Sequence, residues 1–265
     1  MKTYILLLAL IFASASRVSG QAVEPKFEQF TTTSADSLIL HGWGLLSNEE
    51  TNLLVVMLPM MGNTHESYGI YADSINGGLV GAIHDYCSAD SGHAARPHIL
   101  ALDLRGHGES TARNSEKLDY RSMSKDQFAL MPSDVATIVN DFRKEHGEQL
   151  DSVEVVMIGA SIGANSAIMA TTNVPRVSKV ALLSPGSDYR GLKPAGAFSS
   201  FDGNILLMTS RGDSYSFESC QSLARLKPTG WLLKAYPGGD HGTNLIHSDE
   251  RAMHYLVNWI FGLER

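Results

Sequence analysis

The 265-residue sequence has few cysteines, little charge and no surplus of positive charge. Two cysteines cannot build the dense disulfide framework of a small secreted scaffold. Lys and Arg number 21 against 28 Asp and Glu, a formal charge of −7, so no basic surface is available for a nucleic-acid backbone. Hydrophobic residues make up 43% and charged residues 18%, which excludes a disordered chain and indicates an ordinary globular protein.

Long hydrophobic runs are also missing, and the apolar run at the start is short. It covers residues 4–12, follows Lys2 and precedes small residues that end at Gly20. This order is typical of a secretory signal peptide, because a membrane-spanning helix needs about 20 apolar residues. We therefore expect residues 1–20 to be a signal peptide, cleaved after Ala15 or Gly20, and the mature protein to be secreted or periplasmic. A membrane anchor is the alternative.

Export would place Cys87 and Cys220 in an oxidising compartment. A disulfide between them is then permitted, and two separate buried thiols are an equal alternative. Neither cysteine has histidines at the spacing of a zinc site. We expect neither a metal nor a cofactor.

The rest of the chain, residues 21–265, contains no repeat and no linker, so we expect a single domain. Short apolar runs in it have the length and branching of strands buried on both faces. These runs are 53–58, 98–102, 153–158, 180–183, 205–208 and 231–235. Apolar residues recur at helical spacing over 135–142 and 253–261. Buried strands alternating with amphipathic helices predict an α/β protein, with a mostly parallel sheet and helices on both faces.

The first part of the predicted domain reads as an antiparallel hairpin at the sheet edge, with strands at 27–33 and 38–46 around a turn. Together with the runs above, this predicts a sheet of about eight strands. In such a sheet, functional residues follow the carboxyl ends of the strands. The residues directly after each apolar run are therefore the first candidates for a site.

A G-x-S-x-G sequence follows one of these runs. Gly159, Ser161 and Gly163 lie between the run 153–158 and a helical segment at 164–170. A serine on such a sharp turn leaves no room for bulky neighbours two residues away, and the turn raises its hydroxyl above the sheet. The pattern predicts that Ser161 is a nucleophile, with a tight turn as the alternative.

A serine nucleophile needs a base and a group that orients the base. His241 directly follows the last strand, so it is the predicted base. Asp213 follows the run 205–208 and is the predicted acid, whereas Asp188, after the preceding strand, is the alternative.

Two backbone amides are expected to hold the oxyanion of the reaction. One belongs to Ile162, at the start of the helix after the serine. The other follows the run 53–58, with Met61 as the first choice and Met60 as the alternative. We expect these two thioether side chains to form an apolar wall near the serine.

Taken together, these motifs resemble those of the α/β-hydrolase superfamily. LDLRGHGES at 102–110 resembles the loop after the family's fourth strand, and 159–163 resembles its nucleophile turn. The resemblance implies an α/β-hydrolase fold with the triad in the order serine, acid, histidine. One departure is Pro59-Met60, where the family usually has His-Gly.

The sequence also departs from the larger members of this superfamily. Only about 20 residues separate Ser184 from Asn204, where those members insert a helical lid. We therefore expect no large lid domain. The chain is most similar in this respect to small serine esterases and to dienelactone-hydrolase-like proteins.

These residues and the resemblance predict a secreted serine hydrolase, carboxylesterase-like, that acts through an acyl-enzyme on Ser161. The expected substrate is a small-molecule carboxylic ester, with a thioester or an amide as alternatives. A non-catalytic binding protein with the same fold is a competing interpretation. An acyltransferase, which passes the acyl group to an alcohol or amine, is another.

Overall fold

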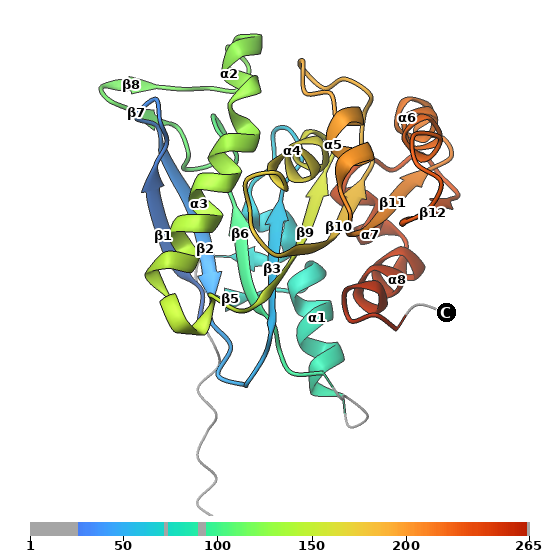
Figure 1. Cartoon of the computed structure of the whole chain (residues 1–265), viewed down its shortest axis with the longest axis horizontal. Helices are drawn as coiled ribbons and strands as arrows, with labels where there is room; N and C mark the ends of the chain where they lie inside the picture. The colour runs from blue at the N-terminus through green and yellow to red at the C-terminus, as the bar shows by residue number, and fades with distance from the viewer. Residues whose placement is uncertain (1–25, 72–73, 90–93, 264–265) are drawn as a thin grey trace, which may run out of the picture.

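The computed structural model describes residues 26–71, 74–89 and 94–263 (Figure 1). The expected signal peptide at 1–20 lies outside these residues. An eight-stranded sheet has the order β1-β2-β6-β3-β9-β10-β11-β12. Its strands are β1 (Glu28–Thr33), β2 (Ile39–Leu45), β3 (Leu53–Leu58), β6 (His98–Leu102), β9 (Glu154–Ala160), β10 (Val177–Leu183), β11 (Asn204–Ser210) and β12 (Trp231–Tyr236). The pairs β1/β2 and β2/β6 are antiparallel and the other neighbours are parallel, which confirms the predicted sheet and its edge hairpin.

Helices cover both faces of this sheet, and each face has its own apolar core. One face carries α1 (Gly78–Ser88), α7 (Thr243–Ser248) and α8 (Glu250–Ile260). The other carries α2 (Lys125–Ala129), α3 (Met131–Glu145), α4 (Ile162–Ala170), α5 (Ala195–Ser200) and α6 (Ser214–Ala224). Shorter elements are β4 (Ile70–Tyr71), β5 (Ser74–Ile75), β7 (Ala112–Arg113), β8 (Glu116–Lys117) and the 3-10 helices at His65–Tyr68 and Gly147–Gln149.

The two predicted amphipathic helices are α3 and α8. In α3, Val135, Ile138, Val139 and Phe142 are all buried in the core beside the sheet. Their spacing of three and four residues puts them on one face of the helix, which explains why that face packs inward. In α8, Trp259 is almost fully buried in the opposite core.

Residues 94–263, which the structure describes without a gap, contain no large lid domain. Between β10 and β11 the chain forms a loop and the six-residue helix α5. This confirms the expectation of no large lid domain. In Figure 1, β3, β9 and β10 point the same way, so the loops after these strands gather at one edge of the sheet.

The loop after β6 is fixed by a buried cation. Arg105 is almost fully buried and forms ion pairs of 2.7 Å with Asp36 and with Asp134. Asp36 lies in the turn of the edge hairpin and Asp134 lies in α3. Burial raises the pKa of Asp134, whereas the Arg105 guanidinium holds the pKa of Asp36 well below its usual range. Arg105 therefore ties three separate segments together.

The two cysteines lie on opposite faces of the sheet and are both free. Cys87, in α1, packs against the core that contains α8. Cys220, in α6, is part of the other core. The disulfide that the sequence left open is therefore wrong, because the whole sheet separates the two sulfur atoms.

This arrangement predicts slow thiol chemistry in the folded protein. Burial raises the pKa of the Cys87 thiol to about 11 and shifts that of Cys220 even further upward. Since only the thiolate reacts, Ellman's reagent at pH 8 should label the native protein very slowly. After denaturation without reductant, both cysteines should titrate rapidly. Fewer thiols in the denatured protein would contradict the two free cysteines.

Candidate active site

Ser161 lies on the turn between β9 and α4, with φ 53° and ψ −119°. Residues with a side chain rarely adopt a positive φ, so this backbone conformation is strained. The turn is held in place because the Ser161 N–H donates to the Leu183 carbonyl at 2.8 Å. The serine is 6% exposed at the carboxyl end of the sheet. This is the geometry that the G-x-S-x-G pattern predicted.

The two glycines of this pattern are required by close backbone contacts. A Cβ on Gly159 would lie 2.3 Å from the Gly163 carbonyl oxygen. A Cβ on Gly163 would lie 2.4 Å from the Pro59 carbonyl oxygen. Both distances are shorter than a side-chain carbon tolerates. The glycines thus let the first turn of α4 approach both β9 and the segment after β3.

The structure brings His241 and Asp213 together. Nδ1 of His241 lies 2.6 Å from Oδ2 of Asp213, and the side chains are 36% and 13% exposed. Asp213 also caps α6, where its Oδ1 accepts a long hydrogen bond of 3.5 Å from the Ser216 N–H. With Nδ1 bonded to the carboxylate, Nε2 is the ring nitrogen left to exchange a proton with a serine.

The alternative acids are engaged elsewhere. Asp188 accepts a hydrogen bond of 2.7 Å from the Gly191 N–H and lies 3.7 Å from the Lys193 ammonium. Asp240, the neighbour of the histidine, accepts a hydrogen bond from Ser248. The structure therefore favours Asp213 over Asp188 as the partner of the histidine.

The histidine loop is tied to two other loops at this edge. The Gly242 N–H donates to Oγ of the buried Ser184 at 3.0 Å. A Cβ on Gly242 would lie 2.7 Å from the sulfur of Met60, so this thioether lies directly beside the histidine loop. The position of Met60 agrees with the expected apolar wall. Met61 instead packs against the core on the other face of the sheet.

The predicted oxyanion amides make no hydrogen bond to the described part of the protein. Within the described residues, the N–H groups of Ile162, Met60 and Met61 donate to no protein acceptor. Ile162 is the first residue of α4, so its N–H also carries the positive end of the helix dipole. The second amide, Met61 or Met60, stays a prediction.

Sequence reasoning missed Tyr189, which lies in the loop after β10. Its ring centroid is 6.2 Å from that of His241, with the ring planes nearly perpendicular. Its hydroxyl lies 3.1 Å from Oγ of Ser216 and donates to the Ser184 carbonyl at 3.3 Å. Tyr189 does not directly follow an apolar run and belongs to no motif, so no sequence signal marks it.

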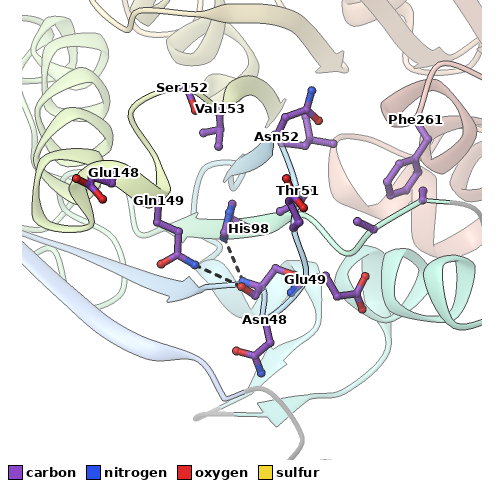
Figure 2. A pocket seen from close by; sticks show the side chains of 15 residues that line it. Asn48, Glu49, Thr51, Asn52, His98, Glu148, Gln149, Ser152, Val153 and Phe261 are labelled. Carbon is purple, nitrogen blue, oxygen red and sulfur yellow. Dashed lines mark hydrogen bonds between the residues drawn. The ribbon is translucent and has the colours of Figure 1, made fainter.

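A large open pocket of about 930 Å³ lies elsewhere on the molecule (Figure 2). Apart from Phe261, which follows α8, its lining comes from residues at or before the amino ends of β3, β6 and β9. In it, Nδ1 of His98 accepts a hydrogen bond of 3.1 Å from the Ser47 N–H. The serine, acid and histidine of the candidate site follow the carboxyl ends of their strands. The pocket is therefore at the opposite edge of the sheet and does not belong to this site.

In the described part of the chain, no group of at least three His, Cys, Asp or Glu side chains could hold a metal ion. Within the same residues, every helix is too short or too polar to cross a membrane.

Comparisons with known proteins agree with the topology. Residues 94–209 match the family model described as serine aminopeptidase, S33. No curated protein sequence matches the chain significantly. Among solved structures, an esterase from Pyrococcus furiosus superposes with a TM-score of 0.65 at 15% identity, over 90% of this chain and 91% of that chain. The chain has the α/β-hydrolase fold.

Further solved structures superpose to a similar degree. A dienelactone hydrolase from Anabaena variabilis gives a TM-score of 0.64 at 15% identity, over 90% of this chain and 99% of that chain. A peroxisomal α/β-hydrolase from Saccharomyces cerevisiae gives 0.63 at 13% identity, over 91% of both chains. At such low identity the likeness concerns the fold. Within this α/β-hydrolase fold, Ser161, Asp213 and His241 occur in the chain order that the fold's triads have.

Proposed function

We propose that this protein is a serine hydrolase that cleaves a small carboxylic ester through an acyl-enzyme on Ser161. The observation that carries the proposal is the 2.6 Å contact of His241 with Asp213 at the edge of the sheet where the strained Ser161 lies. A carboxylate-bound histidine at the same sheet edge as a serine on a strained turn is the arrangement that activates a hydroxyl nucleophile.

The reaction would proceed in two steps on these residues. Nε2 of His241 takes the Ser161 proton while Oγ attacks the ester carbonyl, and the Ile162 and Met61 amides hold the oxyanion. The carbon–oxygen bond to the alcohol then breaks, its electron pair stays on the alcohol oxygen, and the histidine returns the proton to that oxygen. Water repeats the sequence on the acyl-enzyme, which releases the acid and restores the serine.

Several features support an ester as the substrate. Between β10 and β11, where larger hydrolases carry a lid, this chain has a loop and the short helix α5, which favours a dissolved small molecule as the substrate. The Met60 side chain beside Gly242 supplies an apolar contact for an acyl chain. The structural relatives include an esterase and a dienelactone hydrolase. Because part of the chain matches a serine aminopeptidase family model, an amide is the alternative substrate.

Export is part of the proposal. It depends on Lys2, the apolar residues 4–12 and the small residues up to Gly20. We propose that the mature enzyme acts outside the cytoplasm as a secreted or periplasmic protein, without a stable membrane anchor.

A fluorophosphonate probe tests the enzymatic function directly. We expect the folded protein to be labelled covalently, with the label on the peptide that contains Ser161, and to hydrolyse p-nitrophenyl esters. Folded protein that takes up no label and hydrolyses no ester would instead favour the binding protein. Product analysis with an added alcohol separates the remaining alternative, since an acyltransferase would form a new ester.

A further inference from the structure

The loop after β10 carries Tyr189, and several hydrogen bonds fix the backbone of this loop. Tyr189 and Leu192 exchange backbone hydrogen bonds of 3.2 and 2.9 Å across a two-residue turn. The turn residues, Arg190 and Gly191, have φ values of 55° and 96°. Positive φ at both positions is the signature of a tight type I′ turn. The Asp188 carboxylate also accepts the Gly191 N–H at 2.7 Å, so the backbone at Tyr189 is fixed from both sides.

Two neighbouring helices anchor this loop. From α4, the fully buried Asn165 donates to the carbonyls of Gly186 and Leu192 at 2.8 Å each, and accepts the Gly186 N–H at 3.2 Å. From α6, the Tyr215 hydroxyl accepts the Asp188 N–H at 2.9 Å. A Cβ on Gly186 would lie 2.6 Å from the ring of Tyr189, so the glycine lets this ring pack against the loop.

The anchored loop brings Tyr189 next to the proposed base, His241. The Tyr189 hydroxyl lies 3.1 Å from Oγ of Ser216, the residue whose N–H binds Asp213, and the Tyr189 ring stands edge-on to His241. Burial raises the pKa of Tyr189, and the hydroxyls of Ser216 and Ser161 beside it partly offset this shift. The phenol is therefore a neutral hydrogen-bond donor at physiological pH.

The geometry of the tetrahedral intermediate indicates which atom of the substrate such a donor would contact. In the tetrahedral intermediate, the leaving oxygen and Oγ of Ser161 are bonded to the same carbon. The leaving oxygen must also lie within hydrogen-bond distance of His241, which protonates it. The Tyr189 ring stands edge-on to His241, with ring centroids 6.2 Å apart, and its hydroxyl interacts with that of Ser161. These two relations are the basis for placing the phenol within reach of the leaving oxygen.

We propose that Tyr189 is a further catalytic residue, which donates a hydrogen bond to the leaving oxygen of an alkyl ester. This inference depends on the serine hydrolase function proposed above. As the carbon–oxygen bond breaks, its electron pair moves to the leaving oxygen, and that oxygen takes the proton from His241. Tyr189 turns its O–H from the Ser184 carbonyl, where the hydrogen bond is a long 3.3 Å, to the leaving oxygen. It keeps its own proton and stabilises the developing negative charge.

The role of Tyr189 implies a substrate class. An aryl leaving group such as p-nitrophenolate is stable as an anion and gains little from a donor. An alkoxide is a far poorer leaving group and gains much more. A protein that fixes a phenol at this position is therefore suited to esters of ordinary aliphatic alcohols.

The test compares one variant, Tyr189→Phe, on two esters with the same acyl group. For ethyl butyrate we expect kcat/KM to fall about 10- to 100-fold, as for a lost hydrogen bond to a charged group. For p-nitrophenyl butyrate we expect a fall of less than about 3-fold, because this leaving group needs no donor. The ratio between the esters is independent of the fraction of folded protein. Tyr86→Phe, whose ring stacks on Phe261, is the matched control and should change neither value.

The possible outcomes separate the inference from the function on which it depends. An equal fall for both esters, or an unchanged rate on ethyl butyrate, would overturn the role of Tyr189. Wild-type protein that cleaves p-nitrophenyl butyrate but not ethyl butyrate would overturn the alkyl-ester class and leave the serine hydrolase standing. Wild-type protein that cleaves neither ester and takes up no fluorophosphonate would overturn both proposals.

Discussion

Replacing Ser161 by alanine is expected to lower kcat on any ester substrate by about 10⁴-fold or more. The substitution removes the oxygen that forms the acyl-enzyme, and no other hydroxyl can take its place on the strained turn. Alanine and serine accept a positive φ equally poorly, so the thermal unfolding temperature should change little. Steady-state hydrolysis and a thermal melt of the same preparation give both quantities.

Ser199→Ala is a suitable control for this substitution. Ser199 lies exposed on α5, where its hydroxyl donates only to the Ala195 carbonyl of its own helix. The control should keep its activity within about 3-fold of wild type. Ser161→Ala protein that retained more than about a tenth of the activity would show that the nucleophile lies elsewhere.

The serine, acid and histidine could be predicted because each follows an apolar run. Strand burial is a property of consecutive residues, and the carboxyl ends of parallel strands meet at one edge. The ends of the runs at 153–158, 205–208 and 231–235 are therefore enough to predict that Ser161, Asp213 and His241 lie at the same edge of the sheet. The choice of Asp213 over Asp188 needed only the position of each along its loop.

Tyr189 could not be predicted in the same way. Its position depends on the turn through Arg190 and Gly191 and on the buried amide of Asn165, which lies on another helix. The contacts of Asn165 with this loop join residues more than twenty positions apart, and they leave no periodic pattern. A sequence pattern shows which face of a helix or strand is buried. The direction in which a loop side chain points depends on tertiary contacts instead.

The exact ends of strands and the pairing of the two cysteines also depend on tertiary contacts that the sequence pattern does not show. β10 begins at Val177, ahead of the apolar run at 180–183, because its first residues are half-exposed and break the run. The hairpin β7/β8 has two residues in each strand, too few for an alternating pattern to appear. The disulfide question was open because the face on which each cysteine lies follows from the packing of α1 and α6.

The strongest test of the acid is Asp213→Asn, which is expected to lower kcat by about 10⁴-fold. An asparagine amide can donate to Nδ1 of His241, which would place the ring proton on Nε2 and leave no base for the serine. The carbonyl oxygen of asparagine can still accept the Ser216 N–H, so the start of α6 and the stability of the protein should be preserved. Kinetics and thermal unfolding of the variant measure the two effects separately.

Asp240→Asn is the matched control, because Asp240 precedes the same histidine but accepts a hydrogen bond from Ser248. An asparagine oxygen can keep that bond, so we expect kcat to stay within about 3-fold of wild type. The contrast isolates the carboxylate that contacts the ring from a carboxylate that is merely its neighbour in sequence. If Asp213→Asn kept its activity while Asp188→Asn lost it, the histidine would have its catalytic partner in the loop after β10, and the contact of 2.6 Å would be structural only.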